Sequence, residues 1–127
     1  MPYLRHLWIA AVLLLTGCPG PGGLAAGPPR TVEGGWTLAN AGDAPVWPGP
    51  LSAEKAWIAE YQGPQDVTAT FYRYSSATVA FEAMQKRPRT DNELSLHRGN
   101  FVVVVDTTRI PKQAAGDFME GLSKVLH

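Results

Sequence analysis

Few side chains in this sequence of 127 residues have the types and spacing that catalysis requires. Ser95 and His97 stand two residues apart on a predicted strand, and Asp106 ends the next predicted strand, so a Ser-His-Asp combination is conceivable. A serine beside its histidine on one strand face lacks the exposed turn that such a nucleophile needs, and the G-x-S-x-G motif is absent. We therefore expect no catalytic residues and predict that the protein is not an enzyme.

Metal and cofactor chemistry has equally little support in the sequence. Glu93, His97 and Asp106 could share one face of the predicted sheet, but short ligand spacing such as H-x-x-x-H is absent. No Gly-rich loop leads from a strand into a helix, so a nucleotide cofactor is not expected. We predict no metal site beyond weak binding, and no cofactor.

A basic cluster of Lys86, Arg87 and Arg89 lies where the first predicted helix ends. Cations at a helix C-terminus interact favourably with the helix dipole, which explains Lys86 and Arg87 without a partner. The alternative is a contact with an anionic lipid or a cell-wall polymer.

The only cysteine closes an apolar run behind a short basic start. Arg5 precedes nine apolar residues, 7–15, which are too few to span a bilayer and are typical of a secretory signal. The stretch Leu15, Thr16, Gly17 and Cys18 resembles the lipobox of bacterial lipoproteins. This resemblance implies cleavage before Cys18 and attachment of acyl chains such as palmitate at that residue. Two or three chains would hold the protein on the membrane lastingly, so we expect Cys18 to be an anchor.

The alternative at this end of the chain is an ordinary secretory signal, cleaved at a site such as Leu24-Ala25-Ala26. Under the lipobox interpretation, Pro19 stands where enterobacterial lipoproteins retained in the inner membrane carry aspartate, which favours the outer membrane where one exists. We expect a protein anchored by lipid on the non-cytoplasmic side of a bacterial membrane. Removal of residues 1–17 leaves a net charge of about −1, which argues against nucleic acid as a partner.

Composition divides the chain into a signal peptide at residues 1–17, a Gly/Pro-rich tether at 18–53 and a folded domain at 54–127. Trp36 and Trp47 lie in the tether, where solvated linkers rarely place large aromatic residues. We expect at least one of them to pack on the domain. The alternative is that they form a surface for stacking a ligand or docking a partner.

Hydrophobic periodicity predicts strands at 55–61, 66–74, 93–97 and 101–106. Ser75 or Ser76 is expected to cap a helix at 77–86, and a closing helix is expected to begin near Pro111. A two-residue turn at Gly99-Asn100 would pair the last two strands from Arg98 opposite Phe101. The apolar stripe predicted for the first helix comprises Ala77, Ala80, Phe81 and Met84, and that of the closing helix Ala115, Phe118, Met119, Leu122, Val125 and Leu126.

This order predicts an α+β fold with a two-layer ββαββα arrangement, in which a four-stranded, mainly antiparallel sheet carries both helices on one face. The other face would present several apolar side chains, so something should cover it: the segment from Trp36 to Trp47, a second copy of the protein, or a ligand. The candidate face for a ligand or partner consists of Trp36, Trp47, Thr70, Tyr72, Val102 and Val104.

Two functions remain open on these grounds. The first is a non-enzymatic binding or accessory module at the cell envelope, with the membrane and an unknown envelope protein as partners. The second is an envelope protein that uses the open sheet face and its aromatic residues to hold an apolar or aromatic small molecule.

Overall fold

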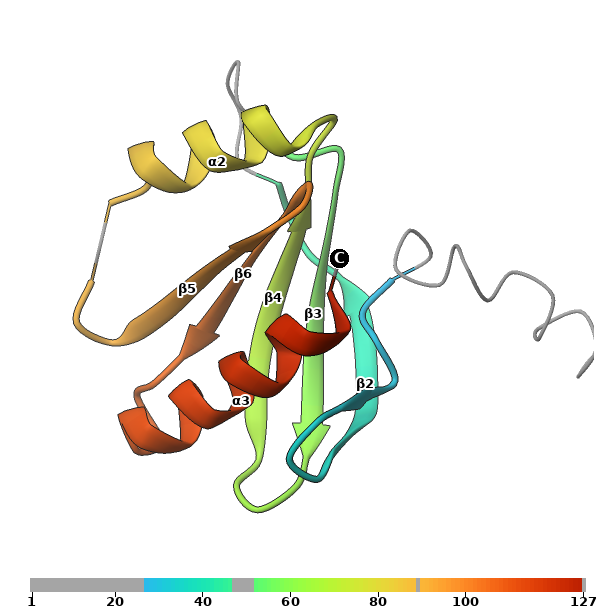
Figure 1. The fold of residues 1–127 in the computed structure, drawn as a ribbon, viewed down its shortest axis with the longest axis vertical. Coiled ribbons are helices and arrows are strands. Elements are labelled where there is room, and N and C mark those ends of the chain that lie inside the picture. The colour runs from blue at the N-terminus through green and yellow to red at the C-terminus, as the bar shows by residue number, and fades with distance from the viewer. Residues whose placement is uncertain (1–26, 47–51, 89, 127) are drawn as a thin grey trace, which may run out of the picture.

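Six strands form one curled sheet in the computed structural model, which describes residues 27–46, 52–88 and 90–126 (Figure 1). All neighbouring strands pair antiparallel, in the order β1-β2-β3-β4-β6-β5. The elements are β1 (Thr31–Val32), β2 (Trp36–Asp43), β3 (Lys55–Gln62), β4 (Val67–Arg73), α2 (Ala77–Lys86), β5 (Glu93–Arg98), β6 (Phe101–Asp106) and α3 (Lys112–Val125).

The expectation of a four-stranded sheet is wrong, although the coarser α+β class holds. The two additional strands come from residues 31–43, which the sequence analysis assigned to a tether. Gly34 and Gly35 form the turn between them with φ of 105° and 99°, a conformation that glycine adopts without steric cost. Beyond this turn β2 pairs with β3 along its length, so backbone hydrogen bonding outweighs the low strand propensity of its Ala, Asn and Gly residues.

The two helices cover opposite faces of the sheet, which corrects the prediction that both lie on one face. Residues of α3 pack with Phe71 and Val103, whereas Ala80 and Ala83 of α2 pack with Tyr72 and Val102. Side chains of successive strand residues point to opposite faces, so these two sets cannot share a side of the sheet. The sheet therefore forms the central layer between α2 and α3.

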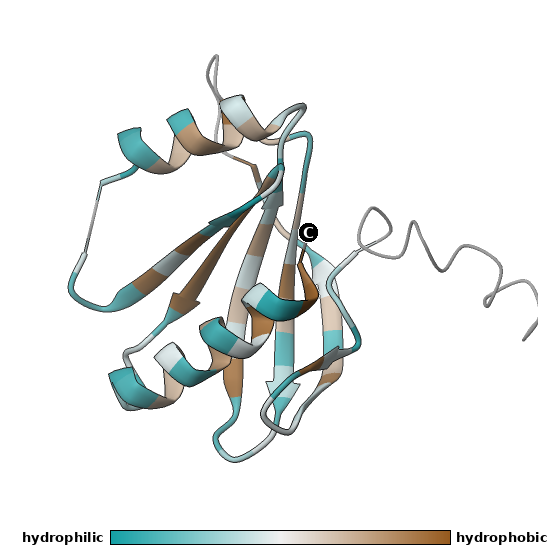
Figure 2. Ribbon diagram, viewed as in Figure 1, coloured by the Kyte–Doolittle hydropathy of each residue, from teal (hydrophilic) through white to brown (hydrophobic). Residues whose placement is uncertain are grey.

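The larger core lies between the sheet and α3. The rings of Phe118 and Trp36 pack edge to face with their centroids 5.4 Å apart, and the centroids of Phe118 and Tyr61 are 5.0 Å apart. Trp36 is only 4% exposed, so the β1–β2 segment is an integral part of this core. Apolar residues continue along β6, which Figure 2 shows as the most uniformly hydrophobic strand.

The last hairpin has the predicted register. Arg98 pairs with Phe101, and Leu96 and Leu94 pair with Val103 and Val105, as a two-residue turn requires. This places Leu94 and Leu96 on the α3 face of the sheet, partly buried against the larger core.

The first helix has the predicted bounds, and Ser76 caps it by accepting a hydrogen bond from the Val79 N–H at 3.1 Å. Its buried face is rotated from the prediction, because Ala80 and Ala83 face the sheet while Phe81 is 46% exposed. Two small residues let α2 approach the sheet, and a phenylalanine among them would not. The second core, beneath α2, is accordingly small.

Candidate functional site

The conceivable catalytic combination does not come together. Ser95 and His97 lie on β5, whereas Asp106 pairs with Glu93, about 13 Å along the strand from His97. His97 Nε2 lies 2.8 Å from the Gly99 carbonyl oxygen, and Asp106 accepts hydrogen bonds from the backbone and hydroxyl of Thr108. Both hydrogen bonds lower the pKa of Asp106, and the one from the Thr108 hydroxyl has the larger effect. Each side chain is thus engaged with its local turn.

The suggested metal ligands are also separated. Glu93 is held by Arg87, and His97 lies four residues away on the same strand. Within the described ranges no group of three or more His, Cys, Asp or Glu side chains is placed to hold a metal ion.

The candidate ligand face is divided by the fold. Trp36 lies in the core on the α3 side, whereas Tyr72, Val102 and Val104 lie on the opposite side and are buried beneath α2. Thr70 is half-buried, and Trp47 lies outside the described residues, as do Leu15, Thr16, Gly17 and Cys18 of the lipobox. The structure thus brings four of the six candidate residues together on one face, since Thr70 pairs with Val104, and buries three of them beneath α2.

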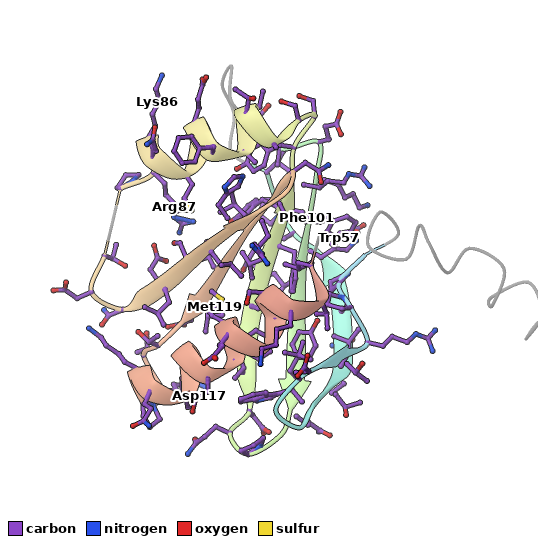
Figure 3. All side chains as sticks on the ribbon, in the orientation of Figure 1. Trp57, Lys86, Arg87, Phe101, Asp117 and Met119 are labelled. Atoms are coloured by element: carbon purple, nitrogen blue, oxygen red, sulfur yellow. The ribbon has the colours of Figure 1, made fainter. Side chains whose placement is uncertain are left out.

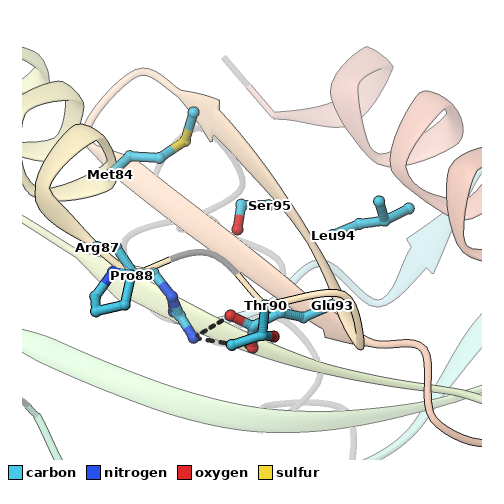
Figure 4. Close-up of a pocket in the computed structure, with 7 residues that line it drawn as sticks. All are labelled: Met84, Arg87, Pro88, Thr90, Glu93, Leu94 and Ser95. Atoms are coloured by element: carbon cyan, nitrogen blue, oxygen red, sulfur yellow. Dashed lines mark hydrogen bonds and ion pairs between the residues drawn. The ribbon is translucent and has the colours of Figure 1, made fainter.

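A cavity of about 270 Å³ lies between the C-terminal end of α2 and the beginning of β5 (Figure 4). Its apolar walls are Met84 and Pro88, and Leu94 borders it from β5 with its side chain on the α3 face of the sheet. Arg87 and Glu93 form its polar wall together with two hydroxyl groups, those of Thr90 and Ser95. Small-molecule sites combine apolar walls with a few placed polar groups, and this volume lies just below their usual range of about 300–1,000 Å³.

A bidentate ion pair fixes the polar wall. Arg87 Nη2 donates to both carboxylate oxygens of Glu93, at 2.9 and 3.0 Å. The two side chains are 15% and 20% exposed, so the pair is largely withdrawn from water. Glu93 stands directly opposite Asp106, a like-charge arrangement that destabilises a sheet unless it is bridged. Arg87 offsets the charge of Glu93, and it also connects the end of α2 to β5.

Two tyrosines adjoin this pair from β4 and the residue that follows it. Burial raises the pKa of the Tyr72 hydroxyl, while the charge of Arg87 and a hydrogen bond with it act in the opposite direction. Burial is also the main cause that raises the pKa of Tyr74. The hydroxyl groups therefore stay protonated, and Tyr72, Arg87 and Glu93 form a polar network beneath α2. Such a network suits recognition of a small polar molecule.

Arg87 and Glu93 were both candidates from the sequence, but they were not expected to pair. Arg87 was assigned to the helix dipole, and Glu93 was considered as a possible metal ligand beside His97 and Asp106. The predicted hairpin register, which places Glu93 opposite Asp106, was the available signal, because a nearby arginine is the simplest way to offset two facing carboxylates.

Comparison with known proteins finds no family model that matches the chain, and no curated protein or solved structure of significant similarity. Within the described part of the chain, no helix has the length and hydrophobicity needed to cross a membrane. The functional argument therefore rests on the residues themselves.

Proposed function

We propose that this chain is a lipid-anchored protein of the bacterial cell envelope that acts by binding and not by catalysis. The observation that carries the proposal is the stretch Leu15-Thr16-Gly17-Cys18 at the end of a nine-residue apolar run. The separation of Ser95, His97 and Asp106 supports the second half of the proposal, since it leaves that combination without a shared site. The expected location is the non-cytoplasmic side of the membrane, with the outer membrane favoured where one exists.

The test of the anchor is the intact mass of the membrane-extracted protein beside a Cys18→Ala variant. We expect a chain that begins at Cys18 with the added mass of two or three acyl chains, and we expect the variant to lose both the added mass and the membrane attachment. An unmodified chain that begins near residue 27 would instead support an ordinary secretory signal.

The cavity at the end of α2 favours a more specific activity, which is the binding of a small molecule with one hydrogen-bonding group and an apolar part. Arg87 and Glu93 would fix the orientation of the polar group, and Met84 and Pro88 would enclose the remainder. This location replaces the open sheet face suggested from the sequence, because α2 covers Tyr72, Val102 and Val104.

Native mass spectrometry of the extracted protein tests this activity. We expect a retained small molecule that is lost in Ser95→Trp, where the indole would fill the cavity from β5. Thr68→Trp is the matched control, since Thr68 is exposed on β4 and does not line the cavity. Equal retention in both variants would exclude this cavity as the binding site.

A further inference from the structure

Strand pairing gathers cations at one end of the sheet. Lys55 pairs with Arg73, Arg73 with Phe101, and Phe101 with Arg98, so three basic residues occupy one row across four strands. Cross-strand partners point to the same face, which here is the face that carries Phe101 and α3. We call Lys55, Arg73 and Arg98 the basic row.

The opposite end of the same strands is acidic. Glu60 lies five residues from Lys55 on β3. Glu93 lies five residues from Arg98 on β5, and it pairs with Asp106 at the other end of the hairpin. We call Glu60, Glu93 and Asp106 the acidic row. An offset of five residues, at about 3.4 Å each, places it about 17 Å along the strands from the basic row and on the α2 face of the sheet. The sheet is thus electrically polar along its strands, although Arg87 offsets the charge of Glu93.

The chain that leads back to Cys18 leaves the domain beside the basic row. Gly27 is buried against Trp57, where a Cβ atom on the glycine would lie 3.8 Å from the indole Nε1. Lys55 Nζ and Arg73 Cζ lie 6.0 and 5.6 Å from the centre of the Trp57 ring. Figure 3 shows Trp57 and Phe101 next to each other on this side of the sheet.

Nine residue steps separate Cys18 from Gly27. Fully extended, they reach about 30 Å, and a flexible coil of this length spans about 16 Å on average. The end of the domain that carries the basic row is therefore the end held nearest to the acyl chains.

We propose that the basic row binds the anionic headgroups of the bilayer in which Cys18 is anchored, with the acidic row turned away. This inference rests on the proposed lipid anchor. Two of the cations have carboxylate partners, since Lys55 lies 3.0 Å from Asp43 and Arg73 lies 3.9 Å from Glu54. Lys55 and Asp43 are 42% and 80% exposed, so this pair is weak and a lipid phosphate can compete for Lys55. Arg73 is 28% exposed and keeps its contact with Trp57, so it adds its charge to the row from a fixed position.

The third cation is placed by α3. The exposed Arg98 donates from Nη2 to the Ser123 carbonyl oxygen at 2.8 Å, near the C-terminal end of the helix. This contact holds the guanidinium in the row while its other N–H groups stay available for phosphate, which arginine binds through several donors at once.

Vesicle sedimentation with the mature chain, which begins at residue 18 and carries Cys18→Ala, tests the inference without the anchor and without the apolar signal segment. We expect binding at low ionic strength to vesicles of phosphatidylcholine mixed with phosphatidylglycerol, and none to phosphatidylcholine alone. Each cation near an anionic surface contributes about fivefold, so joint replacement of Lys55, Arg73 and Arg98 by Gln should weaken binding on the order of 100-fold. The matched control is Arg109→Gln with Lys112→Gln, two exposed cations that flank the beginning of α3 away from the row.

Equal loss in the two sets of variants would overturn the inference, as would the absence of sedimentation with the mixed vesicles. Binding to a soluble anionic cell-wall polymer but not to vesicles would also overturn it. Because Arg73 contributes to packing around Trp57, the single variant Arg98→Gln with an unchanged melting temperature provides a second measurement, with an expected loss of about fivefold. The mass measurement on Cys18 is independent, so a missing anchor and a missing headgroup site are distinguishable.

Discussion

Two glycines of α3 provide a direct test of whether the β1–β2 segment belongs to the domain. Gly116 has open space where a Cβ atom would be, so Gly116→Ala should gain only the helix propensity of alanine, about 1 kcal/mol. At Gly121 a Cβ atom would overlap the Glu33 carbonyl oxygen and lie 2.9 Å from the carbonyl carbon. Because backbone atoms cannot rotate away, β1 must move off the helix in Gly121→Ala.

The magnitude follows from what β1 buries. Val32 is 2% exposed, and returning such a side chain to water costs about 1.5–3 kcal/mol. After the propensity gain of about 1 kcal/mol, Gly121→Ala should lower the free energy of unfolding by about 0.5–2 kcal/mol, so that the two variants differ by about 1.5–3 kcal/mol. For a domain of this size, each kcal/mol shifts the melting temperature by about 4–8 °C.

Thermal unfolding followed by circular dichroism, supported by urea titration, measures this difference. The Cys18→Ala chain is the suitable background, because it avoids acylation. Equal stabilisation of the two variants would refute the reasoning, since it would mean that Glu33 does not lie against α3 and that residues 31–43 are the tether after all.

Three further predictions concern α2 and the tyrosines. Glu93→Gln should destabilise the fold by about 2–3 kcal/mol in urea unfolding, because it leaves the largely buried Arg87 without its counter-charge, and an effect below about 0.5 kcal/mol would contradict the pairing. Phe81→Ser should cost less than Ala83→Ser in the same assay, because Phe81 is exposed and Ala83 faces the sheet; the reverse order would restore the stripe predicted from the sequence. Burial raises the pKa of Tyr61 well above its ordinary value, so stability should fall as the pH rises above about 10, where the unfolded tyrosine ionises first, and Tyr61→Phe should flatten this slope.

Local signals predicted most of residues 54–127. The helix at 77–86 and the strand at 101–106 have the predicted bounds, because a serine cap, a residue before proline and an unbroken Val run are each decided within a few residues. The register of the last hairpin followed from the length of its turn. Features of this kind need no knowledge of the rest of the chain.

The errors concern long-range pairing. The composition of residues 18–53 is that of a linker, and β2 is a strand only because β3 offers a partner and Phe118 receives Trp36. The buried face of α2 was ambiguous for a similar reason, since the helix has apolar residues on two sides. Ala80 and Ala83 are the residues that α2 buries, because the helix lies close to the sheet and only small side chains fit between them. The cavity could not be predicted either, because it forms where α2, in its observed position, meets β5.

The corrected position of β1 changes what an anchor at Cys18 would do. A tether of residues 18–53 would let the domain turn freely and reach partners far from the bilayer. With β1 in the sheet and the Tyr61 hydroxyl donating to the Pro29 carbonyl oxygen at 2.7 Å, only nine residue steps separate Cys18 from the first described residue of the domain. A connection of this length keeps the domain within about one domain diameter of the headgroups.

The cavity at the end of α2 lies beside Glu93, at the acidic end of the sheet, so binding of the basic row to the membrane would leave the cavity open toward the aqueous side. The same domain could then hold the bilayer at one end of its strands and receive a small molecule at the other.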